Sequence, residues 1–387
     1  MRRAPARVIE GERKSTAAPI AAFVKKNAVM LIAALAAAVT SVIVPPDAEY
    51  LGYLDLKTLT CLFCVLAVVC ALKNVRFFYF LAHKIVSVFG NARRCVIALV
   101  YITFIGSMLI ANDMALLTFL PLGYLVLSEA GKERYMAFTF VMQNIAANLG
   151  GMLTPFGNPQ NLYLYSKFNI PTGEFVLIML PSFIISIALI TLLCAVVVKP
   201  ERIEVGECDI RLPGKRCAVY LLLFALSIII VFRFIPYVVG LIVIPVVLLF
   251  MDRSALKKVD YPLLLTFVFF FIFSGNMARI EGVRALFSEL LSISTLVFST
   301  LSCQVISNVP SAILLSQFTD NYRELLIGVN IGGAGTLIAS LASLITFREY
   351  NKRYPGKTGR YVCLFSVINF SFLFILLGAS LLLGALV

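Results

Sequence analysis

Charged residues are scarce in this sequence of 387 amino acids: they make up only 14% of it, whereas 60% of the residues are apolar. Soluble domains carry about 25% charged residues, so the composition excludes a soluble globular protein. The apolar residues form long runs that do not alternate with polar ones, and lipid leaves helices and closed barrels as the only spanning structures. We therefore predict an all-α polytopic membrane protein. The runs lie at residues 28–45, 56–73, 135–147, 173–198, 217–232, 237–251, 260–275 and 361–387.

Histidine occurs once, at His83, and the usual catalytic motifs are missing. There is no H-E-x-x-H, no G-x-S-x-G on a strand, no P-loop and no pair of intramembrane carboxylates. Cys61 and Cys64 form a C-x-x-C pair inside an apolar run, where small packing residues are expected rather than a zinc or redox site. We predict no enzyme activity, no metal and no cofactor, with a membrane-embedded enzyme as a remote alternative. An ion channel is disfavoured because it needs a continuous polar stripe, and here the polar residues form two compact clusters.

Acidic residues number 20 against 33 lysines and arginines, which gives a net charge of +13. The positive-inside rule explains this excess without a nucleic-acid partner. If the basic N-terminus is cytoplasmic, 27 of the 33 cationic residues fall on the cytoplasmic side and 6 outside. The first apolar run is long and its basic leader is extended, so we predict a retained first span rather than a cleaved signal peptide. The prediction is an inner-membrane protein with a cytoplasmic N-terminus and an external C-terminus.

This charge distribution requires two segments that enter the membrane and return on the same side. Residues 95–129 begin and end beside basic residues that are predicted to be cytoplasmic, and residues 293–317 begin and end at predicted outer segments. We predict that the first is an inner and the second an outer re-entrant hairpin. Each follows an amphipathic stretch suited to the membrane interface, at 75–92 and 280–292.

The crossing segments then fall into two halves of opposite orientation, a hallmark of secondary transporters. "NLGGMLTPFG" at 148–157 can be laid on "NIGGAGTLIA" at 330–339 without a gap, and "SMLIAND" at 107–113 lies on "CQVISNV" at 303–309. We predict about nine crossing helices and two hairpins. The chain then begins with a cytoplasmic tail at 1–26. A first inverted repeat at 27–198 contains the inner hairpin 95–129 and a broken span at 135–165, and a cytoplasmic loop and linking helix follow at 199–236. A second inverted repeat at 237–387 contains the outer hairpin 293–317 and a broken span at 325–347.

The segment "NLGGMLTPFGNPQNLYLYS" at 148–166 places glycines, prolines and carboxamides at membrane depth. Glycine and proline interrupt the helix, and open backbone at that depth survives only where it is packed in protein or lines an aqueous cavity. The free N–H groups of half-helix ends attract anions and the free carbonyls attract cations. Close helix packing explains the glycines but not the carboxamides. The predicted substrate-binding residues are Asn158, Gln160 and Asn161 and, in the second broken span, Thr336, Ser340 and Ser343.

Each predicted hairpin has an asparagine where its loop would turn, Asn112 in "IANDMA" and Asn308 in "ISNVPS". Asp113 follows the first of them and is the one acidic residue of 20 that lies at membrane depth. An ionisable residue there is costly and marks function, although an aspartate at the start of a helix can also be a cap. We predict that Asn112, Asp113, Ser307 and Asn308 contact the substrate.

"LIANDMALLTFLPL", "GGMLTPFGNPQNLYLY" and "CQVISNVPSAILLSQF" together resemble the small citrate-transporter-like permeases of bacteria. That group belongs to a superfamily with arsenite pumps, sodium/proton antiporters and divalent-anion/sodium symporters. In the symporters each tip carries Ser-Asn-Thr and forms, with the broken helix, a sodium site and half of the carboxylate site. The tips here read Ala-Asn-Asp and Ser-Asn-Val, so both threonine hydroxyls are missing and Asp113 could support proton coupling. The resemblance implies one coupling-ion site at Ser107, Asn112 and Gly157 and another at Ser307, Asn308 and Ala339.

The predicted function is that of a secondary active permease that moves a small anion, a carboxylate or an oxyanion, across the cytoplasmic membrane with H⁺ or Na⁺. Efflux of the arsenite or antimonite type and cation/proton antiport stay open as alternatives. The predicted partners are the anionic solute, the coupling ion and the lipid bilayer, and the chain could also form a homodimer.

Overall fold

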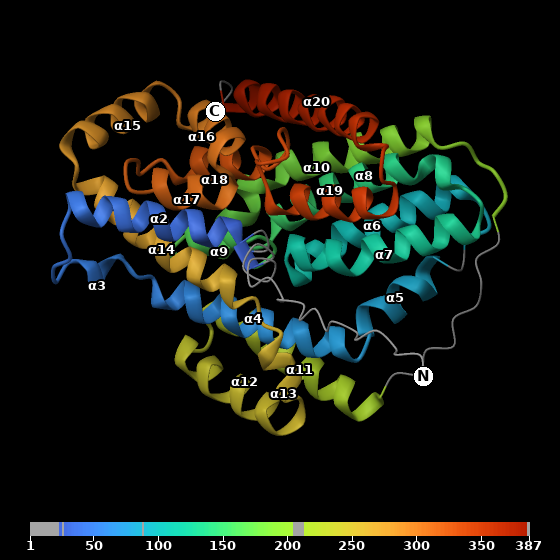
Figure 1. The fold of residues 1–387 in the computed structure, drawn as a ribbon, viewed down its shortest axis with the longest axis horizontal. Helices are drawn as coiled ribbons and strands as arrows, with labels where there is room; N and C mark the ends of the chain where they lie inside the picture. The colour runs from blue at the N-terminus through green and yellow to red at the C-terminus, as the bar shows by residue number, and fades with distance from the viewer. Residues whose placement is uncertain (1–22, 25–26, 87–88, 204–212, 385–387) are drawn as a thin grey trace, which may run out of the picture.

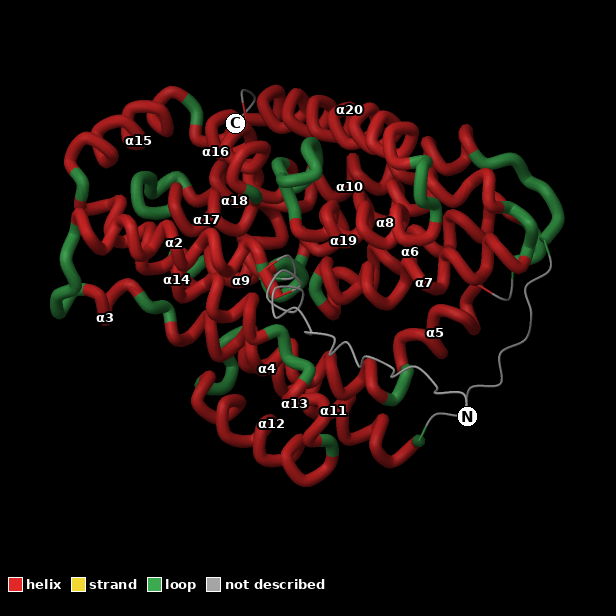
Figure 2. The backbone as a smooth tube through the Cα atoms, viewed as in Figure 1, coloured by secondary structure: helices red, strands yellow, loops and turns green. Residues whose placement is uncertain are grey.

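The computed structural model describes residues 23–24, 27–86, 89–203 and 213–384, and within these ranges it contains helices and no β-strand (Figure 1). This confirms the predicted all-α fold. Most of the predicted tail at 1–26 lies outside the described residues, as do 204–212 of the predicted loop and 385–387. Short loops join most of the helices (Figure 2). The α-helices are α2 (Ala28–Ile43), α3 (Tyr50–Tyr53), α4 (Leu56–Asn74), α5 (Phe77–Val86), α6 (Ala92–Ile110), α7 (Asn112–Glu129), α8 (Met136–Gly150), α9 (Pro159–Lys167), α10 (Thr172–Val197), α11 (Gly214–Val231), α12 (Tyr237–Met251), α13 (Arg253–Lys257), α14 (Tyr261–Arg279), α15 (Glu281–Ile293), α16 (Thr295–Ile306), α17 (Asn308–Leu315), α18 (Tyr322–Ile331), α19 (Leu341–Arg353) and α20 (Thr358–Gly384).

Six of the described helices are long and apolar enough to cross a membrane: α4, α6, α10, α11, α14 and α20. They contain 18 to 27 residues, and at a rise of 1.5 Å per residue they extend about 27–40 Å, compared with about 30 Å for the hydrocarbon core of a bilayer. The helices α2, α12 and α16 are apolar but shorter. Cys61 and Cys64 are buried in α4 as free cysteines. The chain is therefore a multi-pass helical membrane protein.

The helices α6 and α7 form the first predicted hairpin, and a single residue, Ala111, joins them with a φ of 67°. Both ends of the hairpin meet the same residue beyond the C-terminus of α10. The Ala92 N–H donates to the Glu201 carbonyl at 2.7 Å, and Lys132 Nζ pairs with the Glu201 carboxylate at 2.8 Å. The two arms of the hairpin thus begin and end at one end of α10.

The helices α16 and α17 form the second predicted hairpin, joined by Ser307 with a φ of 76°. Its first arm is tied to the start of α18, because the Leu296 N–H donates to a carboxylate oxygen of Glu324 at 2.9 Å. That end of α18 lies at the first turn of α10, where Arg323 pairs with Glu174 at 2.7 Å. Since α10 has 26 residues and is about 39 Å long, the two hairpins open at opposite ends of the molecule.

Both predicted broken spans are interrupted in the structure. In the first, α8 ends at Gly150, a 3-10 turn covers Gly151–Leu153, and α9 begins at Pro159. Proline is favoured at a first helical position, because its fixed φ suits the helix and its missing N–H would have no partner there. In the second, α18 ends at Ile331 and α19 begins at Leu341. Ala137 apart, every residue of α8 is buried, so this break lies inside protein as open backbone requires.

The remaining helices surround this centre. The helices α11 and α12 pack against α4 at one side of the molecule (Figure 1). The helix α2 packs along α14, where the buried Asn276 donates from Nδ2 to Thr40 Oγ1 at 3.2 Å. At the end of α14, Arg279 pairs with Asp47 at 2.7 Å, and this hydrogen bond holds the pKa of the Asp47 carboxyl below its usual value.

Candidate functional site

The two hairpin tips each contact the broken span of their own half. The N–H of Asn112 donates to the Gly157 carbonyl at 3.2 Å, and the N–H of Asn308 donates to the Ala339 carbonyl at 2.9 Å. Both asparagines follow a residue of positive φ and are the first residues of a helix, α7 and α17. The carbonyls that they bind directly precede the caps of α9 and α19. Four helix N-termini therefore meet here, and their free N–H groups and dipoles favour negative charge.

Asn148 links the two halves through its side chain. Its Oδ1 accepts a hydrogen bond from Asn112 Nδ2 at 3.2 Å and another from Ser340 Oγ at 2.8 Å. Asn112 belongs to the first hairpin and Ser340 caps α19 in the second broken span. All three side chains are buried. The predicted residues Asn112 and Ser340 are thus brought together by an asparagine that sequence reasoning used only to align the halves.

Asn330 makes the corresponding link from the second half. Its Oδ1 accepts from Asn158 Nδ2 at 3.3 Å, and its Nδ2 donates to Asn161 Oδ1 at 2.6 Å. The Asn161 amide also donates to the carbonyls of Gly151, Met152 and Thr154 at 3.2–3.3 Å, so it stabilises the non-helical backbone of the first break. Two of the three predicted carboxamides of the first break, Asn158 and Asn161, therefore belong to one buried network across both halves. Asn330, like Asn148, was missed as a site residue, although each lies two residues before the pair of glycines of its break.

Three of the predicted oxygens gather at the second tip. Ser307 Oγ donates to Asn308 Oδ1 at 3.4 Å and lies 3.3 Å from the Ala339 carbonyl oxygen. The group matches the second coupling-ion site that the resemblance implies. Hydroxyl, amide and carbonyl oxygens are the donors that a hard cation prefers.

The first implied coupling-ion site is assembled only in part. Gly157 and Asn112 meet through their backbones, but Ser107 lies within α6, where its hydroxyl donates to the Phe104 carbonyl at 2.8 Å. The position that corresponds to Ser307 is occupied by Ala111, which has no hydroxyl. The structure therefore does not bring Ser107 to the tip, and the first tip lacks the side-chain oxygen that Ser307 provides at the second.

The other predicted residues lie within the same region. Thr336 Oγ1 donates to the Gln304 carbonyl at 3.0 Å and so ties the second break to its hairpin. Gln160 and Ser343 are 1% and 0% exposed, and their Oε1 and Oγ atoms have no hydrogen-bond partner in the described part of the chain. Buried polar groups are nearly always bonded, so unpartnered ones beside a helix break indicate a place for a ligand or water.

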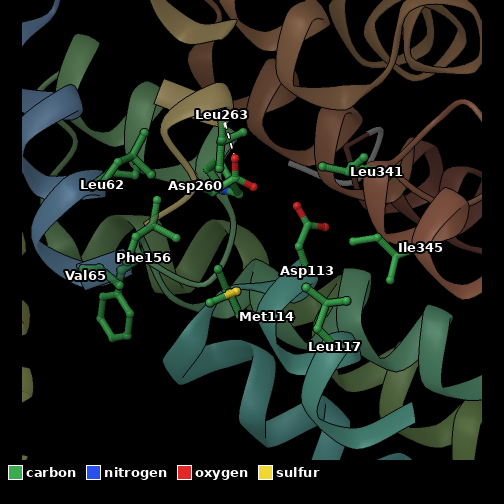
Figure 3. A pocket seen from close by; sticks show the side chains of 14 residues that line it. Leu62, Val65, Asp113, Met114, Leu117, Phe156, Asp260, Leu263, Leu341 and Ile345 are labelled. Carbon is green, nitrogen blue, oxygen red and sulfur yellow. Dashed lines mark hydrogen bonds between the residues drawn. The ribbon is translucent and has the colours of Figure 1, made fainter. Parts of the chain in front are cut away.

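Asp113 faces a small cavity of about 60 Å³ just beyond the first tip. Figure 3 shows its carboxylate pointing into this space toward Asp260, and Leu341 and Ile345 of α19 form another wall. Asp113 Oδ1 has no hydrogen-bond partner among the described residues, whereas Asp260 caps α14 by accepting the Leu263 N–H at 3.0 Å. Sequence reasoning placed Asp260 at the end of a span and missed it, because the contact joins segments far apart in the chain.

A larger cavity of about 850 Å³ shares part of its lining with this space, namely Met114, Leu117, Asp260, Leu263 and Leu341. Its wall also carries four cationic side chains, which belong to the groups predicted to be cytoplasmic. We call this cavity the basic vestibule. The four side chains are Lys73, Arg76, Lys257 and Lys258.

Two hairpin tips and two interrupted helices that meet in a buried polar centre are the arrangement of a membrane transporter. The chain belongs to the citrate transporter family, whose model matches residues 15–322. That match ends at the first residue of α18, so the second break lies beyond it.

Relatives with printed names agree with this assignment. The chain is 32% identical to an uncharacterized transporter of Methanocaldococcus jannaschii, over 85% of this chain and 90% of the relative. It is 29% identical to the inner membrane protein YbiR of Escherichia coli, over 72% of this chain and 75% of the relative. A 46 kDa membrane protein of Mycobacterium leprae is 26% identical over 66% of this chain and 69% of that protein.

Proposed function

We propose that the protein is a secondary active permease that moves a small anion, a carboxylate or an oxyanion, across the cytoplasmic membrane together with H⁺ or Na⁺. The observation that carries this proposal is the buried network of Asn112, Asn148, Asn158, Asn161 and Asn330, which joins two halves whose hairpins open at opposite ends of the molecule. In this proposal residues 27–198 and 237–387 are inverted repeats. Movement of one against the other would expose the centre to each side in turn.

An anionic solute is supported by three features of different kinds. Four helix N-termini meet at the centre, where their dipoles favour negative charge. The four cationic side chains of the basic vestibule would raise the local concentration of an anion at the entrance. The matching family is described as citrate transporters, and citrate is a small polycarboxylate.

Two groups are candidates for coupling. The oxygens of Ser307, Asn308 and Ala339 suit Na⁺, and the carboxylate of Asp113 suits a proton or a cation. The position of Asp260 across the cavity from Asp113 favours cation/proton antiport as the second candidate function. The same side chains would bind the coupling ion in an anion symporter and in a cation/proton antiporter. A measurement of anion binding therefore distinguishes the two functions.

The first test is a thermal-shift screen of the purified protein with citrate, succinate, sulfate, phosphate and arsenite, each with and without sodium. We expect at least one carboxylate or oxyanion to raise the unfolding temperature, because a ligand that binds only the folded state stabilises it. A rise with arsenite alone would favour efflux of the arsenite type. If sodium or pH alone shifted the temperature and no anion did, antiport would replace the proposed function.

The second test concerns orientation. The excess of Lys and Arg on one side predicts a cytoplasmic N-terminus and an external C-terminus. Fusion of alkaline phosphatase, which folds only outside the cytoplasm, to the C-terminus is expected to give active enzyme. A fluorescent protein that folds in the cytoplasm is expected to stay dark at the same position, and the reverse pattern would contradict the proposed inverted repeats.

A further inference from the structure

The contacts of the two halves around the centre match closely. Thr154 in the first half and Thr336 in the second each donate to a carbonyl of the facing hairpin arm, at 2.7 and 3.0 Å. Each tip asparagine donates its N–H to the carbonyl of the residue before the N-cap of the second helix in its own broken span. The side chain of each of these N-cap residues bonds the asparagine at the end of the first helix in the opposite broken span. A contact made in one half therefore has an expected counterpart in the other.

Among the contacts that lack a counterpart, one joins two buried side chains of the network. Asn330 Nδ2 donates to Asn161 Oδ1 at 2.6 Å. In the alignment of the halves Asn330 corresponds to Asn148 and Asn161 to Ser343, so the equivalent pair is Asn148 and Ser343. Serine is shorter than asparagine, and its hydroxyl makes no hydrogen bond with Asn148. Neither Asn148 Nδ2 nor Ser343 Oγ has a partner in the described ranges, although these residues are only 2% and 0% exposed. Unpartnered buried groups of this kind are rare in proteins.

Gln304 makes the hydrogen bonds to the free carbonyls of the second break that Ser343, unlike Asn161 in the first half, does not make. In the first half the amide of Asn161 holds the carbonyls of the break. In the second half Gln304 Nε2, on the hairpin arm, does so by donating to the carbonyls of Gly332 and Ala334 at 2.9 and 3.1 Å. The corresponding position in the first half is Met108, which cannot do this. Residue 343 is thus not needed to hold the backbone.

We infer that Asn148 Nδ2 and the Ser343 hydroxyl bind one oxygen of the transported anion. Both groups can donate a hydrogen bond, and a carboxylate or oxyanion oxygen accepts. Ser343 is in the first turn of α19, where the positive end of the helix also favours an anion. This inference rests on the proposed function and makes it more specific, because it places one oxygen of the anion between α8 of the first half and α19 of the second.

The test compares three variants of the full-length protein. Ser343→Asn supplies the amide oxygen that Asn161 provides in the other half, so it is expected to pair with Asn148, to raise the unfolding midpoint by about 2 °C and to weaken anion binding at least about tenfold. Ser343→Ala removes one donor without adding bulk and is expected to weaken binding about tenfold. Ser274→Ala is the matched control: Ser274 is also buried and unpartnered within the described residues, but it lies on α14.

Binding of citrate, succinate, sulfate and phosphate is measured by thermal shift over a concentration series. Weaker binding of a probe to Ser343→Ala, with unchanged binding to Ser274→Ala, supports the inference even if Ser343→Asn does not fold. A probe that binds the wild type and Ser343→Ala equally well overturns the inference, since only water would then occupy the position, and it leaves the proposed function standing. If no probe stabilises the wild type, the proposed function and the inference fail together.

Discussion

Replacement of Asn112 or Asn308 by Ala is expected to reduce transport to less than about a tenth of the wild-type rate, because a lost buried hydrogen-bond partner costs about 1–3 kcal/mol and 1.4 kcal/mol is a factor of ten. Asn112→Ala leaves Asn148 Oδ1 with one hydrogen-bond donor instead of two. Asn308→Ala removes one of the three oxygens at the second tip. The measurement is uptake into proteoliposomes of the anion that the thermal-shift screen identifies.

The control for this experiment is Asn276→Ala. Asn276 is also buried, but it lies on α14 and bonds Thr40 Oγ1 of α2, with no hydrogen bond to either tip asparagine among the described residues. It is expected to lose stability and to keep the transport rate per folded molecule. If Asn112→Ala and Asn308→Ala transported as well as Asn276→Ala, the tips would be excluded from the pathway. Loss in only one tip variant would show that the halves contribute unequally.

The all-helical fold could be predicted from the sequence because apolar length indicates which segments can cross lipid. The side on which cations accumulate predicts the orientation of these segments, which the fusion experiment tests. Residues 95–129 were predicted as a hairpin on these grounds, and α6 and α7 cover 92–110 and 112–129 with one residue between them. The breaks followed from glycine and proline, whose effect on a helix is local. The hairpin and the breaks were predicted from local residue preferences and charge counts, which do not depend on how the helices pack.

The partners within the site could not be predicted in the same way. Asn148 bonds Ser340, 192 residues further along the chain, and Asn158 bonds Asn330, 172 residues away. Such pairs depend on how the two halves pack, and a helical break indicates only that open backbone needs partners. Asp260 was overlooked for the same reason, because only packing places the start of α14 across a cavity from Asp113.

Ser107 shows the limit of the resemblance. It was assigned to the first coupling-ion site by analogy with a tip that carries serine directly before asparagine, whereas Ser107 precedes Asn112 by five residues. The alignment of the halves pairs it with Cys303 instead. In the structure Ser107 Oγ donates to the Phe104 carbonyl of its own helix. The spacing of residues along the chain was therefore a better guide than residue type.

Conversion of Asp113 to Asn is expected to abolish accumulation driven by a proton or sodium gradient while substrate exchange continues. Asparagine keeps the shape and the hydrogen-bonding capacity of the side chain but cannot ionise. Asp113 faces a cavity whose wall is shared with the basic vestibule, and its Oδ1 makes no hydrogen bond within the described residues. An ionisable group in such a place can take up and release a cation or proton as the site changes sides.

The matched control is Asp55→Asn, since Asp55 also lies at a helix N-terminus and its Oδ1 caps α4 by accepting the Thr58 N–H at 3.0 Å. Asparagine is about as good a cap as aspartate, so this variant is expected to accumulate substrate like the wild type. Gradient-driven uptake and counterflow exchange are measured side by side in proteoliposomes. Full accumulation of substrate by Asp113→Asn would exclude Asp113 from coupling. The oxygens of Ser307, Asn308 and Ala339 would then be the coupling-ion site to test. That test replaces Ser307 with Ala and measures the sodium dependence of uptake.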